Sequence, residues 1–190
     1  MKPRAALCAL AVAGAVVSSA DDAGARPSES GVYTEAGLGA SGFVGQAAAH
    51  ARVGPAASLR VGYDVLPWLS AGGALAASTH EATVPPPPEG EHLQIYDAAA
   101  ELRLAPPVSA FVPYLSGGAG VSVMSTNVLE KVGMLDPEQR ASPRFHAGGG
   151  LEYQLQDRHY AFGVGADWSI TPRFGGAQSI SGRAFIRYTY

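Results

Sequence analysis

The sequence is dominated by segments of about ten residues in which apolar and polar side chains alternate, separated by stretches rich in turn-forming residues. Successive side chains of a β-strand point to opposite faces, so this period of two predicts strands with one apolar and one polar face. The pattern fits eight strands of an all-β, antiparallel up-and-down transmembrane β-barrel. We expect these strands over residues 31–41, 56–66, 69–80, 92–105, 110–124, 144–156, 159–170 and 180–190.

Charged residues occupy only one of the two faces. Strands with two or more charges test this best, and in each of them the charges keep a single parity, as Arg183 and Arg187 do. An arginine facing the middle of a bilayer costs about 2–4 kcal/mol, so a charge-free face is expected on a lipid-facing surface. The polar face would then line the barrel and hold a network of charges: Glu35, Arg60, Asp64, Asp97, Glu101, Arg103, Glu152, Asp167, Arg183 and Arg187.

The polar face is also rich in Gly, Ala and Ser, which suits the crowded interior of a narrow barrel better than a hydrated exterior. Charged residues make up 15% of the chain, below the roughly 25% that is usual for soluble domains. A soluble extracytoplasmic β-barrel that binds a ligand would alternate as well, with the apolar face inside. We treat that fold as the weaker alternative.

The connections alternate between short and long. Turns at 66–68, 105–109 and 156–158 are tight, whereas 42–55, 81–91, 125–143 and 171–179 are long. This asymmetry predicts periplasmic turns and extracellular loops, and an even strand count places both ends of the barrel segment on the periplasmic side. Aromatic residues near strand ends are either an interfacial girdle or ordinary strand aromatics: Tyr33, Tyr63, Trp68, Phe111, Tyr153, Tyr160, Trp168, Tyr188 and Tyr190.

The N-terminus has the organisation of a secretory signal peptide over residues 1–20. Lys2 and Arg4 precede an apolar stretch that is too short to span a bilayer, and small residues follow it. This predicts Sec-type export, a periplasmic lead over residues 21–30, and a barrel over 31–190. Cys8 lies inside the apolar stretch, so cleavage would leave a chain without cysteine.

The chain ends in Phe185, Ile186, Arg187, Tyr188, Thr189 and Tyr190, with apolar residues at alternate positions before a terminal aromatic. Hairpin phrases such as GYDVLPWLSAGGALAAS (62–78), VPYLSGGAGVSV (112–123) and AGGGLEYQLQDRHYAFGVGADWS (147–169) accompany it. Together they resemble the OmpA-like small outer-membrane β-barrel superfamily. The resemblance implies an outer-membrane location, contact with lipid and the barrel-assembly machinery, and an assembly signal formed by Phe185, Ile186, Tyr188 and Tyr190.

Signals for catalysis or cofactor binding are weak. The chain has no Gly-x-Ser-x-Gly elbow, and His159 near Asp157 has no evident serine partner. His80 and His92 flank one loop, but surface positions explain the five histidines better than metal ligation does. With a net charge of −3 and no basic patch, nucleic-acid binding is not expected. We expect no enzyme activity, cofactor or metal.

The leading functional interpretation is a non-enzymatic integral outer-membrane barrel with a structural or surface-interaction role. One form of this role is to serve as the barrel component of an envelope complex. Its long loops would contact a protein partner, and its lumen charges would form a salt-bridged plug. The alternative is a narrow channel for ions or small solutes through the same lumen.

Overall fold

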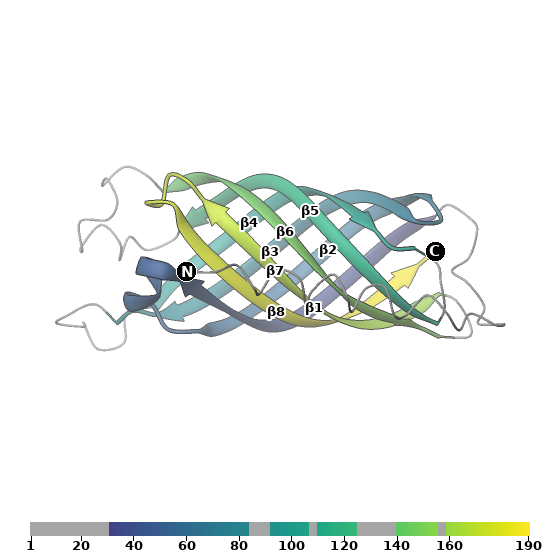
Figure 1. Ribbon diagram of the computed structural model, residues 1–190, viewed down its shortest axis with the longest axis horizontal. Helices are drawn as coiled ribbons and strands as arrows, with labels where there is room; N and C mark the ends of the chain where they lie inside the picture. The colour runs from purple at the N-terminus through teal and green to yellow at the C-terminus, as the bar shows by residue number, and fades with distance from the viewer. Residues whose placement is uncertain (1–30, 84–91, 107–109, 125–139, 156–158) are drawn as a thin grey trace, which may run out of the picture.

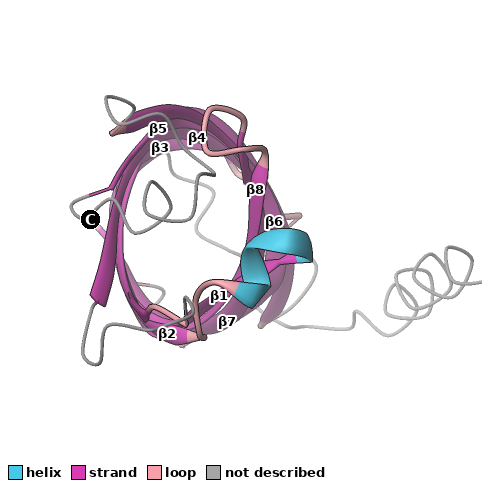
Figure 2. Cartoon of the chain, turned by 90° about the vertical axis from the view of Figure 1, so that its left-hand side faces the viewer, coloured by secondary structure: helices cyan, strands magenta, loops and turns pink. Residues whose placement is uncertain are grey.

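Backbone hydrogen bonds close the eight strands into one antiparallel barrel in which each strand pairs with its sequence neighbours and β1 pairs with β8 (Figures 1 and 2). The computed structural model describes residues 31–83, 92–106, 110–124, 140–155 and 159–190. The signal peptide and lead expected over 1–30 lie outside these residues. The strands are β1 (Val32–Val44), β2 (Gly54–Leu66), β3 (Leu69–Glu81), β4 (His92–Leu104), β5 (Phe111–Met124), β6 (Ala141–Gln154), β7 (Tyr160–Thr171) and β8 (Ala177–Thr189).

The expected fold class and strand number are confirmed, but several strands extend further toward the long loops. β1 continues to Val44 and β8 begins at Ala177, because these two strands keep pairing as far as Val44 and Gln178. A short 3-10 helix, η1 (Gly45–Ala49), then leads into β2. No helix in the described part of the chain has the length and hydropathy needed to cross a membrane.

Both ends of the barrel sheet lie at the end with the short turns. The Tyr190 N–H donates to the Val32 carbonyl at 2.9 Å, which ties the last residue to the first strand. In Figure 1 the C-terminus lies at the opposite end from η1 and the β7–β8 turn. This agrees with the arrangement that alternating loop lengths predict.

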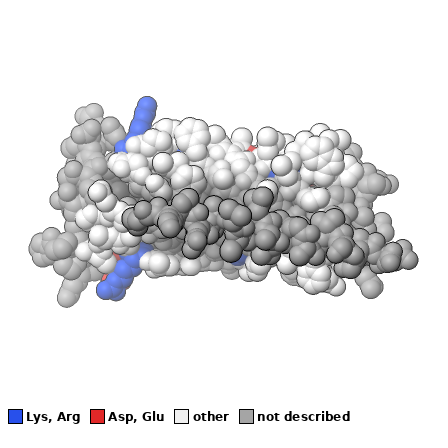
Figure 3. Space-filling view, viewed as in Figure 1, with Lys and Arg blue, Asp and Glu red and all other residues white. Residues whose placement is uncertain are grey.

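The outward parity is apolar throughout the middle of the barrel. Leu38, Leu115 and Val164 are 72%, 65% and 59% exposed, which is the reverse of a water-soluble barrel that buries such side chains. In the space-filling view, Lys and Arg project only near the long-loop end (Figure 3). Among the described strands, Glu81 is the one charged residue on the outward parity. It ends β3 and pairs with exposed Arg52 at 3.1 Å.

The aromatic residues gather mainly at the short-turn end. Phe111 contacts Tyr153 with ring centroids 4.8 Å apart, and Tyr188 lies 4.8 Å from both Tyr160 and Tyr190. These rings come from the short-turn ends of β5 to β8, where a membrane interface would favour them. Trp168 belongs to the opposite end, and Tyr33 is buried in the lumen.

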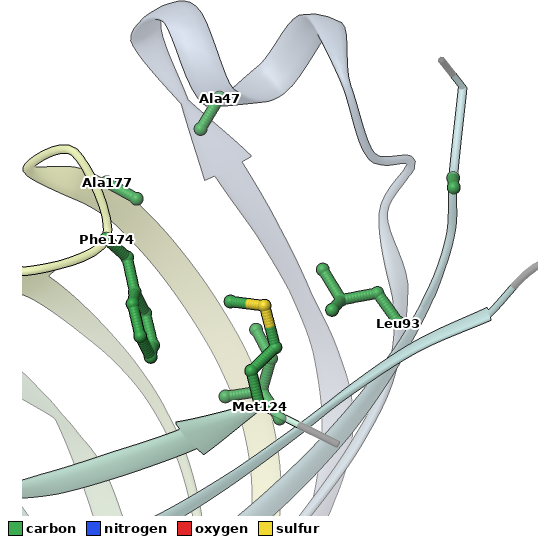
Figure 4. Packing of buried hydrophobic residues seen from close by; sticks show 7 residues of the cluster. Ala47, Leu93, Met124, Phe174 and Ala177 are labelled. Atoms are coloured by element: carbon green, nitrogen blue, oxygen red, sulfur yellow. The ribbon is translucent and has the colours of Figure 1, made fainter. Parts of the chain in front are cut away.

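An apolar cluster fills the mouth at the long-loop end. Phe174, Met124 and Leu93 point into one space below the turn of helix that carries Ala47 (Figure 4). Phe174 belongs to the β7–β8 turn, where Gly175 and Gly176 have positive φ angles of 60° and 69°. A side chain with a Cβ would be strained there, so these glycines permit the turn that directs Phe174 inward.

The apolar exterior predicts that the loss of stability caused by an added charge depends on where along the strand the charge is placed. Val164→Arg, near the middle of β7, should lower the free energy of unfolding by about 2–4 kcal/mol, because it places a guanidinium in acyl chains. Leu104→Arg, at the last residue of β4, should cost only about 0–1 kcal/mol, since it lies near the interface. Urea titrations of the folded protein in phospholipid vesicles measure both values. Equal costs would contradict the membrane orientation.

Candidate functional site

The lumen is organised around Glu35, which lies on the inward parity of β1 and is 1% exposed. Its Oε1 accepts a hydrogen bond from Arg60 Nη1 at 2.9 Å, and its Oε2 accepts one from Arg103 Nη1 at 2.7 Å. Arg183 Nε lies 3.6 Å from the same Oε1. One carboxylate therefore joins β1 to β2, β4 and β8.

The arginines continue the network across the barrel. Arg60 also donates from Nε to Glu101 at 3.1 Å and from Nη2 to Asp167 at 3.3 Å. Arg103 donates to Glu152, and Arg183 donates to Asp167. A buried charge is tolerated when it is paired and hydrogen-bonded, so these contacts explain how so many ionic groups are accommodated at mid-height.

A second group lies nearer the short turns. Arg187 Nη2 donates to both oxygens of Asp64 at 2.6 and 2.8 Å, and the Ser70 hydroxyl donates to Asp64 at 2.5 Å. The Arg187 guanidinium lies 3.9 Å from the centroid of the Tyr33 ring, a cation–π contact. Tyr33 is therefore part of the lumen filling.

Two further rings occupy the lumen between these groups. The Arg103 guanidinium lies 3.7 Å from the Tyr114 ring centroid, and Tyr114 meets Phe185 edge to face at 5.9 Å. Gly163 and Gly165 on β7 make room for them, since a Cβ at either position would collide with Phe185 or with Tyr114. Of the residues proposed as an assembly signal, Phe185 thus faces the lumen, whereas Ile186 and Tyr190 are exposed outside.

The structure places all ten residues of the expected charge network on the lumen side and adds two to it. Arg144 Nε lies 3.5 Å from Asp97 Oδ2, and His146 Nε2 lies 3.1 Å from Glu101 Oε2. Both lie on the inward parity of β6, as Glu152 does. The alternation of side chains along this strand was therefore enough to assign them to the lumen network.

The interpretation of the histidines as surface residues is wrong for two of the five. His146 is 6% exposed, and His80 is 1% exposed with its ring nitrogens 3.0 Å from the Arg52 carbonyl and the Ser78 hydroxyl. His92 is exposed on the opposite parity, so the two histidines that flank the β3–β4 connection face different sides of the wall. Within the described residues, no group of three or more His, Cys, Asp or Glu side chains is arranged to hold a metal.

His159 is exposed, and its Nδ1 lies 2.8 Å from the Thr189 carbonyl. Asp157, the carboxylate considered as its partner, lies outside the described residues. Residues 84–91 and 125–139, which make up most of two of the long loops, lie outside them as well.

A cavity of about 70 Å³ lies between the ion network and the apolar cluster at the mouth. Inward serines form much of its wall, and Arg60, Asp167 and Arg183 form its floor. Glu35, Arg103 and Glu152, further toward the short turns, do not line it. The arrangement is that of a lumen filled by ion pairs and rings in one half, with a cavity lined by serines, charged groups and apolar side chains in the other.

The sequence matches the model of the outer membrane protein β-barrel domain over residues 6–186. The chain belongs to this family. It is an outer-membrane protein, and its apolar exterior lies in the lipid bilayer. No curated protein matches the sequence significantly.

Solved structures of small outer-membrane barrels are similar in fold. Neisserial surface protein A has a TM-score of 0.63 at 13% identity, and the alignment covers 85% of this chain and 99% of that one. OprG from Pseudomonas aeruginosa has a TM-score of 0.54 at 12% identity, with 89% and 96% covered. The N-terminal β-barrel domain of OprF from the same organism has a TM-score of 0.50 at 12% identity, with 85% and 100% covered. At these identities the likeness shows the fold alone.

The network predicts a large stability effect at its centre. Glu35→Gln should lower the free energy of unfolding by about 3–5 kcal/mol, because it leaves Arg60 and Arg103 buried without their shared carboxylate. The matched change Glu81→Gln removes an exposed ion pair and should cost less than about 1 kcal/mol. Urea unfolding in vesicles measures both, and a Glu35→Gln cost as small as that of Glu81→Gln would contradict the central role of Glu35.

Proposed function

We propose that this protein is a non-enzymatic outer-membrane barrel with a structural or surface-interaction role, and that its lumen is closed. The observation that carries the proposal is the ion network beneath the cavity, where Arg60 bridges Glu35, Glu101 and Asp167. Arg103 and the rings of Tyr114 and Phe185 occupy the next layer. An eight-stranded barrel is just wide enough for side chains to fill it, so these layers leave little space for transport.

The interaction surface would be the long-loop end, which faces the cell exterior in this proposal. Loops on a rigid scaffold are common sites of recognition, and the mouth presents exposed Arg52 and Arg173 beside η1 and the β7–β8 turn. A protein partner bound there would make the chain the barrel component of an envelope complex. Neisserial surface protein A, a structure of similar fold, is named as a surface protein.

Export and assembly follow from the two ends of the chain. Residues 1–20 would direct Sec-type export and be removed. Ile186, Tyr188 and Tyr190 on the outward parity of β8, with Phe185 anchored in the lumen, would be the segment that the barrel-assembly machinery engages.

The second candidate is a narrow path for ions or small solutes. The cavity favours it, because inward serines and charged groups line part of an open space within the lumen. For conduction, this space would have to continue past Arg60 and Arg183 toward the short turns.

Planar bilayer recordings separate the two candidates. The native protein should give no reproducible single-channel steps, because ion pairs and rings fill the lumen. The double variant Glu35→Ser with Arg60→Ser removes one charge of each sign and opens the floor of the cavity, so steps should appear in it. A difference in gel migration before and after boiling confirms that both proteins are folded. Reproducible steps in the native protein would reject the closed lumen in favour of a channel.

A further inference from the structure

A groove runs along the outer wall of the barrel over β4, on the side that faces the lipid. Two adjoining hollows of about 480 Å³ each form it, and their linings share Leu59, Leu75, Ala98 and Val121. Small residues on the outward parity of β3 and β4 make the floor of this β4 groove. These floor residues are Gly73, Ala77, Ala98 and Ala100.

The side chains that border the β4 groove stand clear of its floor. Leu59, Leu75 and Val121 are 48%, 56% and 51% exposed. They come from β2, β3 and β5, so they lie on both sides of β4. Neighbouring side chains do not fill the floor, because a Cβ added at Gly73 would meet nothing closer than the Ala99 carbonyl oxygen at 3.8 Å. The groove is therefore an apolar, concave surface within the bilayer.

Polar side chains continue the same outward face toward the long-loop end. The Tyr96 hydroxyl donates to Gln94 Oε1 at 2.9 Å at the end of the groove. Beyond it, exposed Arg52 pairs with Glu81 at 3.1 Å. From the groove to the rim, the paired outward residues of β3 and β4 are Gly73 with Ala100, Leu75 with Ala98, Ala77 with Tyr96, Thr79 with Gln94 and Glu81 with His92. This wall thus changes from apolar to ionic along its length.

The neighbouring wall over β5 and β6 does not show this change within the described residues. Its outward pairs nearest the long loops are apolar, with Val121 opposite Pro143 and Val123 opposite Ala141. The combination of an apolar groove and ionic pairs beyond it therefore distinguishes the β3–β4 wall from the wall beside it.

We propose that the β4 groove binds one membrane phospholipid, with an acyl chain along Ala98 and Ala100 and the head group against the polar pairs of β3 and β4. An acyl chain in the groove contacts the floor and both sides, and such dispersion contacts are individually small but add up. The head group of a phospholipid is charged, and Arg52 and Glu81 offer groups of both signs to it. The polarity of the wall thus matches that of the lipid along its length.

A second copy of the chain fits the groove less well than a lipid does. A symmetric dimer would bring the same surface of both copies together, and two concave surfaces leave a gap between them. The lining of such a gap has no partner atoms and loses its dispersion contacts. A flexible acyl chain can follow the groove without leaving a gap. The inference holds whether or not the lumen conducts, and it needs no partner at the loops.

Native mass spectrometry tests the proposal without an activity assay. The protein is folded into vesicles of palmitoyl-oleoyl phosphatidylethanolamine and phosphatidylglycerol and extracted into a mild non-ionic detergent. Gel migration before and after boiling confirms that it is folded. We expect one phospholipid to remain bound to each protein. A spectrum with bare protein, with bound detergent only, or with a dimer that carries no lipid would overturn the proposal.

Three variants make the test specific. Ala98→Leu fills the floor of the groove, so the fraction of protein that carries a lipid should fall about tenfold, because overpacking a filled contact has a cost of this order. Gly73→Leu fills the other end of the floor and should act in the same way. Ala166→Leu makes the matched change on the exposed, outward parity of β7, outside the groove, and should keep the lipid. Lipid retained by both groove variants, or lost equally from all three, would contradict the assignment.

Photocrosslinking locates the bound chain. A phosphatidylcholine with a diazirine in its acyl chain is added to the vesicles and irradiated, and the crosslinked residues are identified by peptide sequencing. Crosslinks should be more frequent on β3 and β4 than on β7, and Ala98→Leu should remove the excess. Equal crosslinking of all strands would assign the retained lipid to the general lipid shell and reject the groove.

Discussion

The buried carboxylate of Glu35 is the interaction on which the lumen depends. It bonds to Arg60 and Arg103 and approaches Arg183, so one side chain connects four of the eight strands across the barrel interior. The underlying constraint is electrostatic. A barrel with acyl chains outside and a narrow lumen inside must neutralise its ionic groups within the lumen, because little water is available to solvate them.

Small residues on the inward face provide the space that this network and its neighbouring rings occupy. Gly163 and Gly165 leave space for Phe185 and Tyr114, and those rings lie against Arg103 and Arg183. In the other half of the lumen, serines line much of the wall, and a cavity of about 70 Å³ remains below the apolar cluster at the mouth. The two halves are therefore filled by different means, with guanidinium and aromatic groups in contact toward the short turns and with the apolar cluster around Phe174 at the mouth.

Much of this architecture could be predicted from the sequence because a strand has a period of two. The parity of Arg60 and Asp64, or of Arg183 and Arg187, assigns a face without any knowledge of the partner strand. The choice of partner could not be predicted, since Arg60 and Asp167 lie 107 residues apart and meet only when the barrel closes. His80 lies on the inward parity of β3, so the alternation indicated its burial, whereas its contact with the Arg52 carbonyl, from the segment before β2, could not be predicted. The further extension of β1 and β8 was missed because backbone pairing continues through polar residues such as Gln178.

The orientation of the alternating side chains is the central claim, and site-directed spin labelling tests it most directly. Cys8 is the single cysteine of the chain, so in a protein produced without residues 1–20 a cysteine introduced at each position from 57 to 65 in turn carries the label alone. In vesicles, collision with lipid-soluble oxygen should be greatest at 57, 59, 61, 63 and 65 and should fall at the even positions between them. Uniform oxygen access along β2, or maxima at the positions of Arg60 and Asp64, would contradict the account.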